Sequence, residues 1–324
     1  MAKNGASFWA RGPGITIIVL VAVVVATAAG AFAFLHILTH PARNTRMLDP
    51  EEVLLRAEEI ELRASDGVPL SGWFVKGRPD RAVIILCHDL GAARSSLLNS
   101  AAALNRAGFP LFLLDFRGHG RSGGSGSSLG IDERLDILAV VDFLSGRPAT
   151  VNDRFGVWGT GMGAYAAALA SIDNAKISAL ALDSIYPDIE SELDRLALRG
   201  APQAARPALR LLRLFYNPYF RFRLARYSVR RLLPRLAGRD LVFIAGSDDA
   251  ARLEQEKLLY AQLPDDPSGE KNFLEMGASS ASGLYAEDKK RYDDALVDFF
   301  TTYLADAGHR AGDAVEGGLQ VLEK

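Results

Sequence analysis

Residues 159–163 read Gly-Thr-Gly-Met-Gly, and they lie between an apolar run and a stretch of small residues that begins at Ala164. A glycine-rich turn between a strand and a helix can hold a pyrophosphate, because backbone N–H groups point outward at the helix N-terminus. Asp183 follows about 20 residues later, where an acidic side chain would contact the ribose of a dinucleotide. Dinucleotide binding is therefore one hypothesis for this chain.

Side chains for nucleophilic or acid–base chemistry are few. The single cysteine, Cys87, excludes an internal disulfide and a cysteine-based zinc or iron–sulfur site, and we expect neither a metal nor a cofactor. The serines at 122, 125, 127 and 128 belong to a glycine-rich loop, where we expect them to supply flexibility. A serine nucleophile needs a general base, and the chain has only five histidines: His36, His40, His88, His119 and His309.

The elements that would position these residues alternate between apolar strands and helices. We predict a hairpin from 58–64 and 70–75, strands at 82–87, 110–116, 154–158, 177–183, 241–245 and 272–275, and helices at 95–107, 130–146, 162–172, 250–262 and 285–305. This pattern is typical of a doubly wound α/β domain with eight strands, most of them parallel. Residues 186–238 interrupt the alternation and form a predicted cap.

Three motifs in this framework resemble the α/β-hydrolase superfamily, and residues 50–305 are similar to its serine aminopeptidase-like branch. His88-Asp89-Leu90-Gly91 follows the third strand, where the family commonly has His-Gly-x-Gly. Residues 115–122 read Asp-Phe-Arg-Gly-His-Gly-Arg-Ser and mark the fold without being catalytic. Residues 159–163 stand where the family has the nucleophile elbow Gly-x-Ser-x-Gly. The resemblance implies an α/β-hydrolase fold: an eight-stranded mostly parallel sheet with helices on both faces and a helical cap.

The resemblance also assigns the catalytic positions. The nucleophile position holds Gly161, and Thr160 precedes the apex of the turn, so we expect its side chain to point away from the pocket. The oxyanion hole would use the backbone N–H groups of Leu90 and Met162. The triad acid corresponds to Asp249, whose alternative role is to cap the next helix, and the base position holds Ser279 and Ser280 instead of histidine.

Loss of both nucleophile and base leaves the acyl-enzyme route without a starting point. We therefore predict a noncatalytic pseudohydrolase that acts in binding or regulation. The alternative is an active family enzyme, such as an esterase, lipase or aminopeptidase, with an unconventional nucleophile or base. The dinucleotide hypothesis is weaker in this context, since four strands precede the glycine-rich turn and a cap follows Asp183.

An uncharged apolar segment at 15–38 is long enough for one transmembrane helix, because about 20 helical residues cross a bilayer core. The competing interpretation is a signal peptide cleaved near Ala28. We expect a single-pass membrane protein bound to lipid through 15–38. Lys3 and Arg11, against Arg43 and Arg46, favour an extracytoplasmic main domain. The remaining predicted boundaries are a flank at 1–14, a linker at 39–50 that lets the domain tumble, the domain at 51–305 and a flexible tail at 306–324.

Charge is unevenly distributed along the chain. Residues 197–239 contain eleven arginines and no acid, although the net charge of the whole chain is only −2. Such a basic segment with interleaved aromatic residues suits anionic lipid headgroups. Alternatively, the arginines pair with acids of the domain itself. Nucleic-acid binding is not expected, because the rest of the chain is acidic. The candidate membrane-contacting residues are Arg221, Arg223, Arg226, Arg230 and Arg231.

Overall fold

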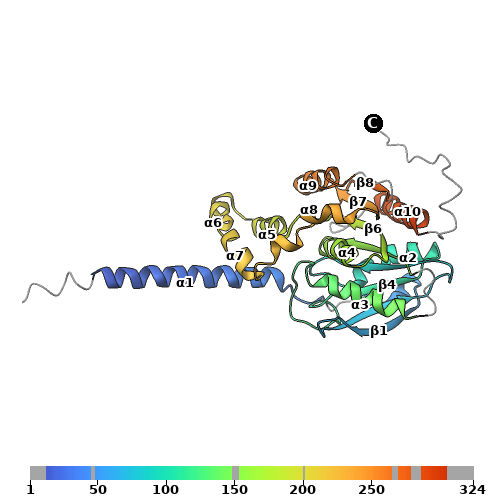
Figure 1. The fold of residues 1–324 in the computed structure, drawn as a ribbon, viewed down its shortest axis with the longest axis horizontal. Coiled ribbons are helices and arrows are strands. Elements are labelled where there is room, and N and C mark those ends of the chain that lie inside the picture. The colour runs from blue at the N-terminus through green and yellow to red at the C-terminus, as the bar shows by residue number, and fades with distance from the viewer. Residues whose placement is uncertain are drawn as a thin grey trace, which may run out of the picture.

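The computed structural model describes residues 12–44, 48–147, 153–199, 201–264, 269–278 and 286–304. Figure 1 shows a long helix, α1 (Gly12–Thr39), that leads into an α/β domain. The apolar part of α1, Ile15–Thr39, is long and apolar enough to cross a membrane, as a signal sequence also would be. Most of its large apolar side chains are exposed, so the domain does not cover them.

One eight-stranded sheet forms the centre of the domain, in the order β1-β2-β4-β3-β5-β6-β7-β8. β2 pairs antiparallel with β1 and β4, and the other neighbouring strands pair in parallel. All eight predicted strands are present, with ends within a few residues of the prediction. Their bounds are β1 (Ala57–Arg63), β2 (Pro69–Val75), β3 (Val83–Cys87), β4 (Leu111–Asp115), β5 (Phe155–Thr160), β6 (Ile177–Asp183), β7 (Asp240–Gly246) and β8 (Lys271–Met276).

Helices cover both faces of the sheet because its central strands are apolar on both sides. Every residue of β3 and β4 is buried, which is typical of covered parallel strands. One face packs against α3 (Glu133–Ser145), α4 (Met162–Asp173) and α9 (Ala250–Ala261). The other packs against α2 (Leu98–Arg106) and α10 (Ala286–Tyr303). Two short 3-10 helices lie at Pro50–Val53 and Arg94–Leu97.

The strand order changes direction at β3: β4 lies beside it on one side and β5 on the other. In open α/β sheets this switch point leaves a crevice at the carboxyl ends of the strands, where ligands bind. The loops after β3 and β5 lie at that crevice, so the sheet places residues 88–91 beside residues 159–163.

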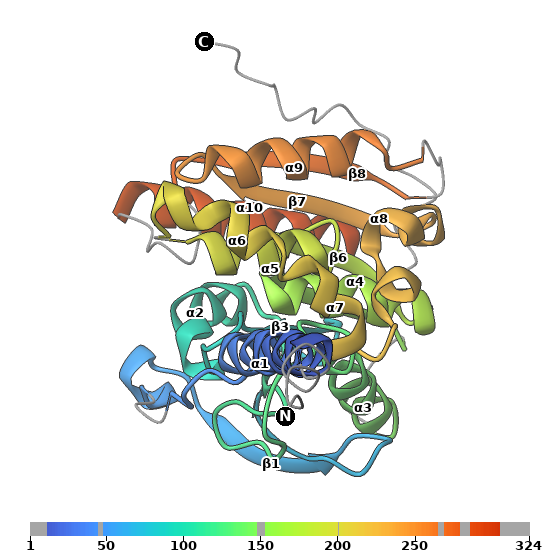
Figure 2. The ribbon, with the colours of Figure 1, turned by 90° about the vertical axis from the view of Figure 1, so that its left-hand side faces the viewer.

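The predicted cap between β6 and β7 consists of short helical elements on the same side as α1 (Figure 2). They are α5 (Ile189–Leu198), η3 (Gln203–Ala205), α6 (Arg206–Arg210), α7 (Arg213–Tyr219), η4 (Leu224–Tyr227), α8 (Val229–Leu232) and η5 (Leu233–Leu236).

The end of α1 is seated on the domain. Leu35 is fully buried, and the Thr39 hydroxyl lies 2.7 Å from the Tyr219 hydroxyl of α7. Ser127 donates its backbone N–H to the Thr39 carbonyl at 2.8 Å, and Arg43 donates to the Ser122 carbonyl at 2.6 Å. The expectation of a freely tumbling linker is therefore wrong for residues 39–44, because tertiary hydrogen bonds hold this polar stretch.

Candidate functional site: an occupied oxyanion hole

The turn at residues 159–163 is as tight as its glycines require. β5 ends at Thr160 and α4 begins at Met162, so only Gly161 lies between strand and helix, with a φ of 52°. A Cβ at position 163 would lie 2.3 Å from the Cys87 carbonyl oxygen of β3, which excludes any side chain there. The turn therefore presses the start of α4 against the end of β3.

The backbone N–H groups of Leu90 and Met162 converge on one atom, as an oxyanion hole requires, but that atom belongs to the protein. Both donate to Oδ1 of Asp89, at 2.7 Å from Leu90 and 2.8 Å from Met162. Donors at these distances are the geometry expected around the oxygen of a reaction intermediate. The Asp89 carboxyl group therefore occupies the place of the substrate oxyanion.

The same carboxyl group also fills the space of the missing nucleophile. A Cβ built on Gly161 would lie 2.1 Å from Asp89 Oδ1, closer than two such atoms can approach. A serine at 161 would therefore require the Asp89 carboxyl group to move from its present position. The two departures from the family pattern, at residues 89 and 161, thus lie in direct contact.

Burial raises the pKa of Asp89 above its usual value, and the Arg252 charge together with the two N–H donors opposes this shift. Desolvation is the larger effect, since a carboxylate loses more hydration on burial than two hydrogen bonds restore.

His88 and His119 make structural hydrogen bonds through both ring nitrogens. His88 lies with Nδ1 2.8 Å from the Asp89 carbonyl and accepts the Phe116 N–H at Nε2. His119 lies with Nδ1 2.9 Å from the Arg117 carbonyl and accepts the Gly91 N–H at Nε2. Burial, with the nearby His119, lowers the pKa of His88 to about 3. Through these hydrogen bonds to backbone groups, the two rings fix the loops after β3 and β4 to each other.

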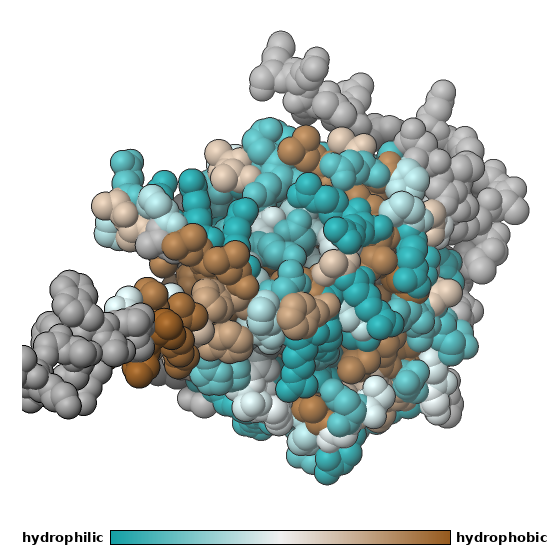
Figure 3. Space-filling model, turned by 60° about the vertical axis from the view of Figure 1, so that its left-hand side comes forward, coloured by the Kyte–Doolittle hydropathy of each residue, from teal (hydrophilic) through white to brown (hydrophobic). Residues whose placement is uncertain are grey.

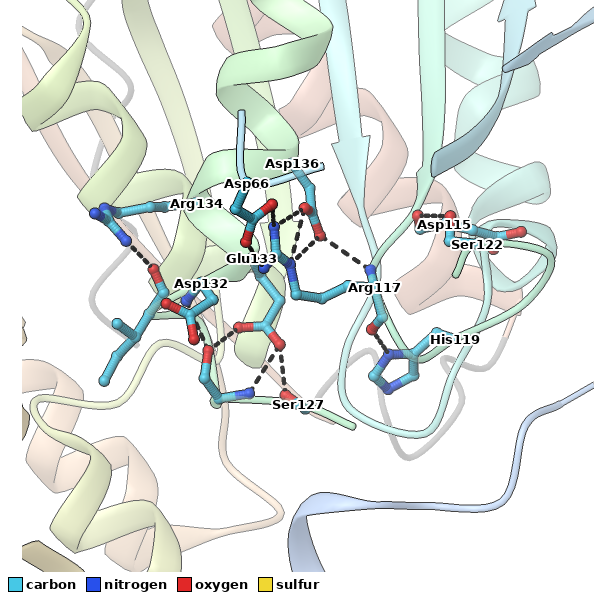
Figure 4. Close-up of polar contacts among 12 residues, drawn as sticks. Asp66, Asp115, Arg117, His119, Ser122, Ser127, Asp132, Glu133, Arg134 and Asp136 are labelled. Atoms are coloured by element: carbon cyan, nitrogen blue, oxygen red, sulfur yellow. Dashed lines mark hydrogen bonds and ion pairs between the residues drawn. The ribbon is translucent and has the colours of Figure 1, made fainter. Parts of the chain in front are cut away.

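The motif after β4 forms a buried polar network (Figure 4). Arg117 donates to Asp136 of α3 at 2.6 Å and to Asp66 at 2.5 Å. Burial lowers the pKa of Arg117, but hydrogen bonds to both acids raise it above its ordinary value. Burial also raises the pKa of Asp136 to about 7, although the hydrogen bonds and charge of Arg117 oppose that shift. Glu133 accepts the hydroxyls of Ser127 and Ser128 at 2.8 and 2.7 Å.

The expectation that these loop serines provide flexibility is consequently wrong for Ser122, Ser127 and Ser128. All three are buried and hydrogen-bonded, and Ser122 also donates to the Asp115 carbonyl. The Glu133 carboxyl group and the Asp115 carbonyl, each five to seven residues away in the chain, accept these hydroxyls and hold the loop in one conformation. Sequence alone did not reveal these partners.

Asp249 caps a helix. Its carboxyl group accepts the backbone N–H of Arg252 at 3.1 Å, at the N-terminus of α9. Arg252 itself donates to the Ser184 carbonyl at 2.6 Å and lies 3.4 Å from the buried Glu256. Burial raises the pKa of Glu256 to about 9 despite that arginine. Sequence reasoning missed this Arg252–Glu256 pair, although its i, i+4 spacing on a predicted helix was a usable signal.

The carboxyl group of Asp183, the candidate ribose contact, is also hydrogen-bonded to other residues of the domain. It accepts the Tyr292 hydroxyl at 2.6 Å and the Ser184 hydroxyl at 2.8 Å. Since the Met162 N–H at the start of α4 is bound to Asp89, the dinucleotide hypothesis loses both of its recognition contacts.

A cleft of about 570 Å³ lies beside Asp89 at the carboxyl end of the sheet. Thr160 lines it, so the expectation that this residue points away from the pocket is wrong. Thr160 lies two residues from Trp158, and side chains two apart share one face of a strand. The other lining residues are Asn44, Leu90, Gly91, Ala92, Ser96, Leu97, Asn99, Ser100, Trp158, Lys289 and Tyr292.

The remaining predicted site residues are the two serines at the base position and the arginines of the cap. Ser279 and Ser280 lie outside the described residues. Among the cap arginines, Arg223 pairs with Asp132 at 2.7 Å and Arg230 lies 3.6 Å from Asp188, whereas Arg221, Arg226 and Arg231 are exposed. Within the described part of the chain, no cluster of three metal-binding side chains is present.

This sheet order, the turn at Gly161 and the converging N–H groups define an α/β-hydrolase fold. Residues 78–265 match the serine aminopeptidase, S33, family, and the chain belongs to that family. Solved structures agree on the fold. The Pyrococcus furiosus esterase Pf2001 superposes with a TM-score of 0.64 at 23% identity, over 82% of this chain and 99% of the esterase.

Curated relatives match a smaller share of this chain than the esterase does, at somewhat higher identity. The α/β-hydrolase domain-containing protein WAV2 of Arabidopsis thaliana is 31% identical over 146 residues, 44% of this chain and 47% of WAV2. The chain thus spans about half the length of that relative. The uncharacterized protein YfhR of Salmonella typhi is 26% identical over 77% of this chain and 83% of its own length.

Proposed function

We propose that this chain is a membrane-anchored, noncatalytic member of the serine aminopeptidase family that acts in binding or regulation. The observation that carries the proposal is Asp89 Oδ1, which accepts both oxyanion-hole N–H groups and fills the space of a side chain at Gly161. A substrate carbonyl would find neither an attacking group at residue 161 nor free donors for its oxygen.

The cleft beside Asp89 remains available for a ligand and supports a binding role. Its polar lining, with Asn99, Ser100 and Lys289 at one side, would orient a small molecule without reacting with it. The anchor is supported by α1, whose apolar side chains stand exposed along the length needed to cross a bilayer.

The competing function is an active enzyme with an unconventional nucleophile, and the one observation in its favour is Thr160 in the cleft wall. Labelling the detergent-solubilised full chain with a fluorophosphonate, and assaying short-chain esters and aminoacyl amides, separates the two. We expect neither labelling nor turnover. Stoichiometric labelling at Thr160, with turnover abolished by Thr160→Val and kept in Thr301→Val, would establish the enzyme instead.

Carbonate extraction of native membranes tests the anchor. The full chain should stay with the membrane at high pH, whereas a chain whose apolar segment had been cleaved would be released.

A further inference from the structure

The cap carries an unusual set of exposed apolar side chains. Outside α1, only six large apolar residues of the described chain are exposed, and three of them lie in or beside α6 and α7. These are Leu211, Leu214 and Phe222, with exposed fractions of 61%, 71% and 75%. Figure 3 shows the apolar surface of α1 meeting further apolar surface on the domain beside it.

Contacts with α1 fix the depth of this region relative to a membrane. The Phe32 ring lies 6.3 Å from that of Phe215 and 5.7 Å from that of Tyr219, both on α7. A helix that enters the hydrocarbon core at Ile15 leaves it about 20 residues later, near residue 34. Phe32 is therefore at the boundary of the core, and α7 lies level with that boundary.

The backbone at the end of α7 closes that helix in a left-handed cap, in which Phe222 donates its N–H to the Asn217 carbonyl at 2.7 Å and Arg221 donates to the Pro218 carbonyl at 3.1 Å. Arg221 and Phe222 have φ values of 53° and 58°, in the left-handed region that bulky residues rarely occupy. Phe222 gains no burial from this conformation, which directs an aromatic ring outward. The cap therefore leaves a large apolar side chain in contact with the surroundings of the domain.

Charge on the same region suits a lipid surface. Arg206, Arg210 and Arg221 are exposed and, within the described residues, make no ion pair with an acid. By contrast, Arg213 pairs with Asp194 and Arg223 with Asp132. Unpaired arginines beside exposed leucine and phenylalanine are the composition of segments that lie in the headgroup layer of anionic membranes.

We propose that this cap edge, formed by Arg206, Arg210, Leu211, Leu214, Arg221 and Phe222, inserts into the headgroup region of an anionic bilayer. The inference rests on the proposed membrane anchor, since α1 sets its depth. α1 and the cap edge together hold the domain in one orientation relative to the lipid, because residues 39–44 are hydrogen-bonded to the loop that follows β4.

Site-specific fluorescence on the full chain in nanodiscs tests the proposal. Cys87 is fully buried, so an environment-sensitive dye will label an introduced cysteine selectively. We choose Leu214→Cys and Phe222→Cys, with Leu258→Cys on α9 as the matched control, because it is 62% exposed but belongs to an element that makes none of these contacts with α1. In nanodiscs with 30% phosphatidylserine, the first two dyes should shift to the blue and lose at least half of their emission to lipids with shallow nitroxides.

Arginine variants separate charge attraction from simple proximity. Glutamine at the three unpaired positions should reduce quenching at residue 214 at least twofold, whereas glutamine at three paired positions should leave it unchanged. The unpaired set is Arg206, Arg210 and Arg221, and the paired set is Arg213, Arg223 and Arg230.

Failure of this inference is distinguishable from failure of the anchor. If the full chain resists carbonate extraction but the dye at 214 stays as water-exposed as the dye at 258, the anchor stands and the cap edge does not enter the bilayer. Equal quenching in neutral phosphatidylcholine and in phosphatidylserine nanodiscs would also overturn the claim of anionic recognition.

Discussion

At the scale of single residues, Asp89 and Gly161 depend on each other. The carboxyl oxygen of Asp89 occupies a position that a side chain at 161 would need, and it accepts the two N–H groups that would otherwise face an empty hole. Buried N–H groups without an acceptor are costly, so Asp89 stabilises the loops after β3 and β5 that carry these groups.

We expect Gly161→Ser to destabilise the domain by about 1–3 kcal/mol, the usual cost of overpacking. Asp89→Gly should relieve part of that cost, so the double variant should be more stable than the sum of the two single changes predicts. Thermal unfolding followed by tryptophan fluorescence measures the cycle. Additive effects would show that the two residues do not meet, and esterase activity in the double variant would reveal a base that we have not identified.

His88 makes stability depend on pH. Its folded-state pKa of about 3 lies below the usual 6.5, so between these values the unfolded chain binds a proton that the folded chain excludes. Stability should therefore fall as the pH falls from 6.5, by up to about 1.4 kcal/mol per pH unit from this group. His88→Asn should show a shallower decline over the same range. An NMR titration of His88 with a midpoint near 6.5 would contradict this account.

At the scale of elements, the loop after β4 is held by polar contacts with three other segments. Arg117 joins Asp136 of α3 to Asp66 of the β1–β2 turn, and His119 joins the same loop to Gly91. These contacts hold the loop after β3 against the loop after β4. The motif at residues 115–122 thereby supports the site through its structure.

Arg117→Met should cost about 3–5 kcal/mol, because it leaves Asp136 buried without its partner. The matched control is Arg78→Met, which breaks an ion pair whose side chains are 60% and 49% exposed and should cost less than about 1 kcal/mol. Shifts in the unfolding temperature of the two variants measure the difference. Equal shifts would mean that the network is not a structural support.

The elements themselves could be predicted from sequence, but their polar partners could not. Apolar runs such as 177–183 gave β6 with its correct ends, because a strand buried on both faces has a distinctive composition. In the sequence, the carboxyl group that fills the oxyanion hole is seen only as an aspartate at position 89, where the family commonly has glycine. Its meaning depends on the distance to Gly161, 72 positions away in sequence, and local patterns carry no such information.

At the scale of the whole molecule, the end of the apolar helix α1 packs against the domain. Leu35 is fully buried and Thr39 bonds to Tyr219 of the cap, so the apolar segment does not end where the domain begins. Leu35, Thr39 and Arg43 therefore belong to the fold of the domain, although their position in the sequence suggests an anchor and linker.

A chain that begins at residue 48 should be less stable than one that begins at residue 30. The shorter chain loses the buried Leu35 side chain and the Arg43 hydrogen bonds, and loss of a buried leucine typically costs about 2–5 kcal/mol. Comparing the unfolding temperatures of the two soluble chains measures this contribution. If they match, the contacts of residues 35–43 do not stabilise the domain.

The Thr39–Tyr219 contact joins residues 180 positions apart, and this separation orders events during synthesis. A ribosome adds about 5–20 residues per second, so roughly 10–35 s pass between the two residues. During that interval α1 has been synthesised but the cap residues that it contacts have not. The Leu35 side chain is then not yet buried, and chaperones and proteases can reach it. Nascent chains arrested just before Tyr219 should leave a cysteine at position 35 reactive, whereas chains arrested well beyond the cap should protect it.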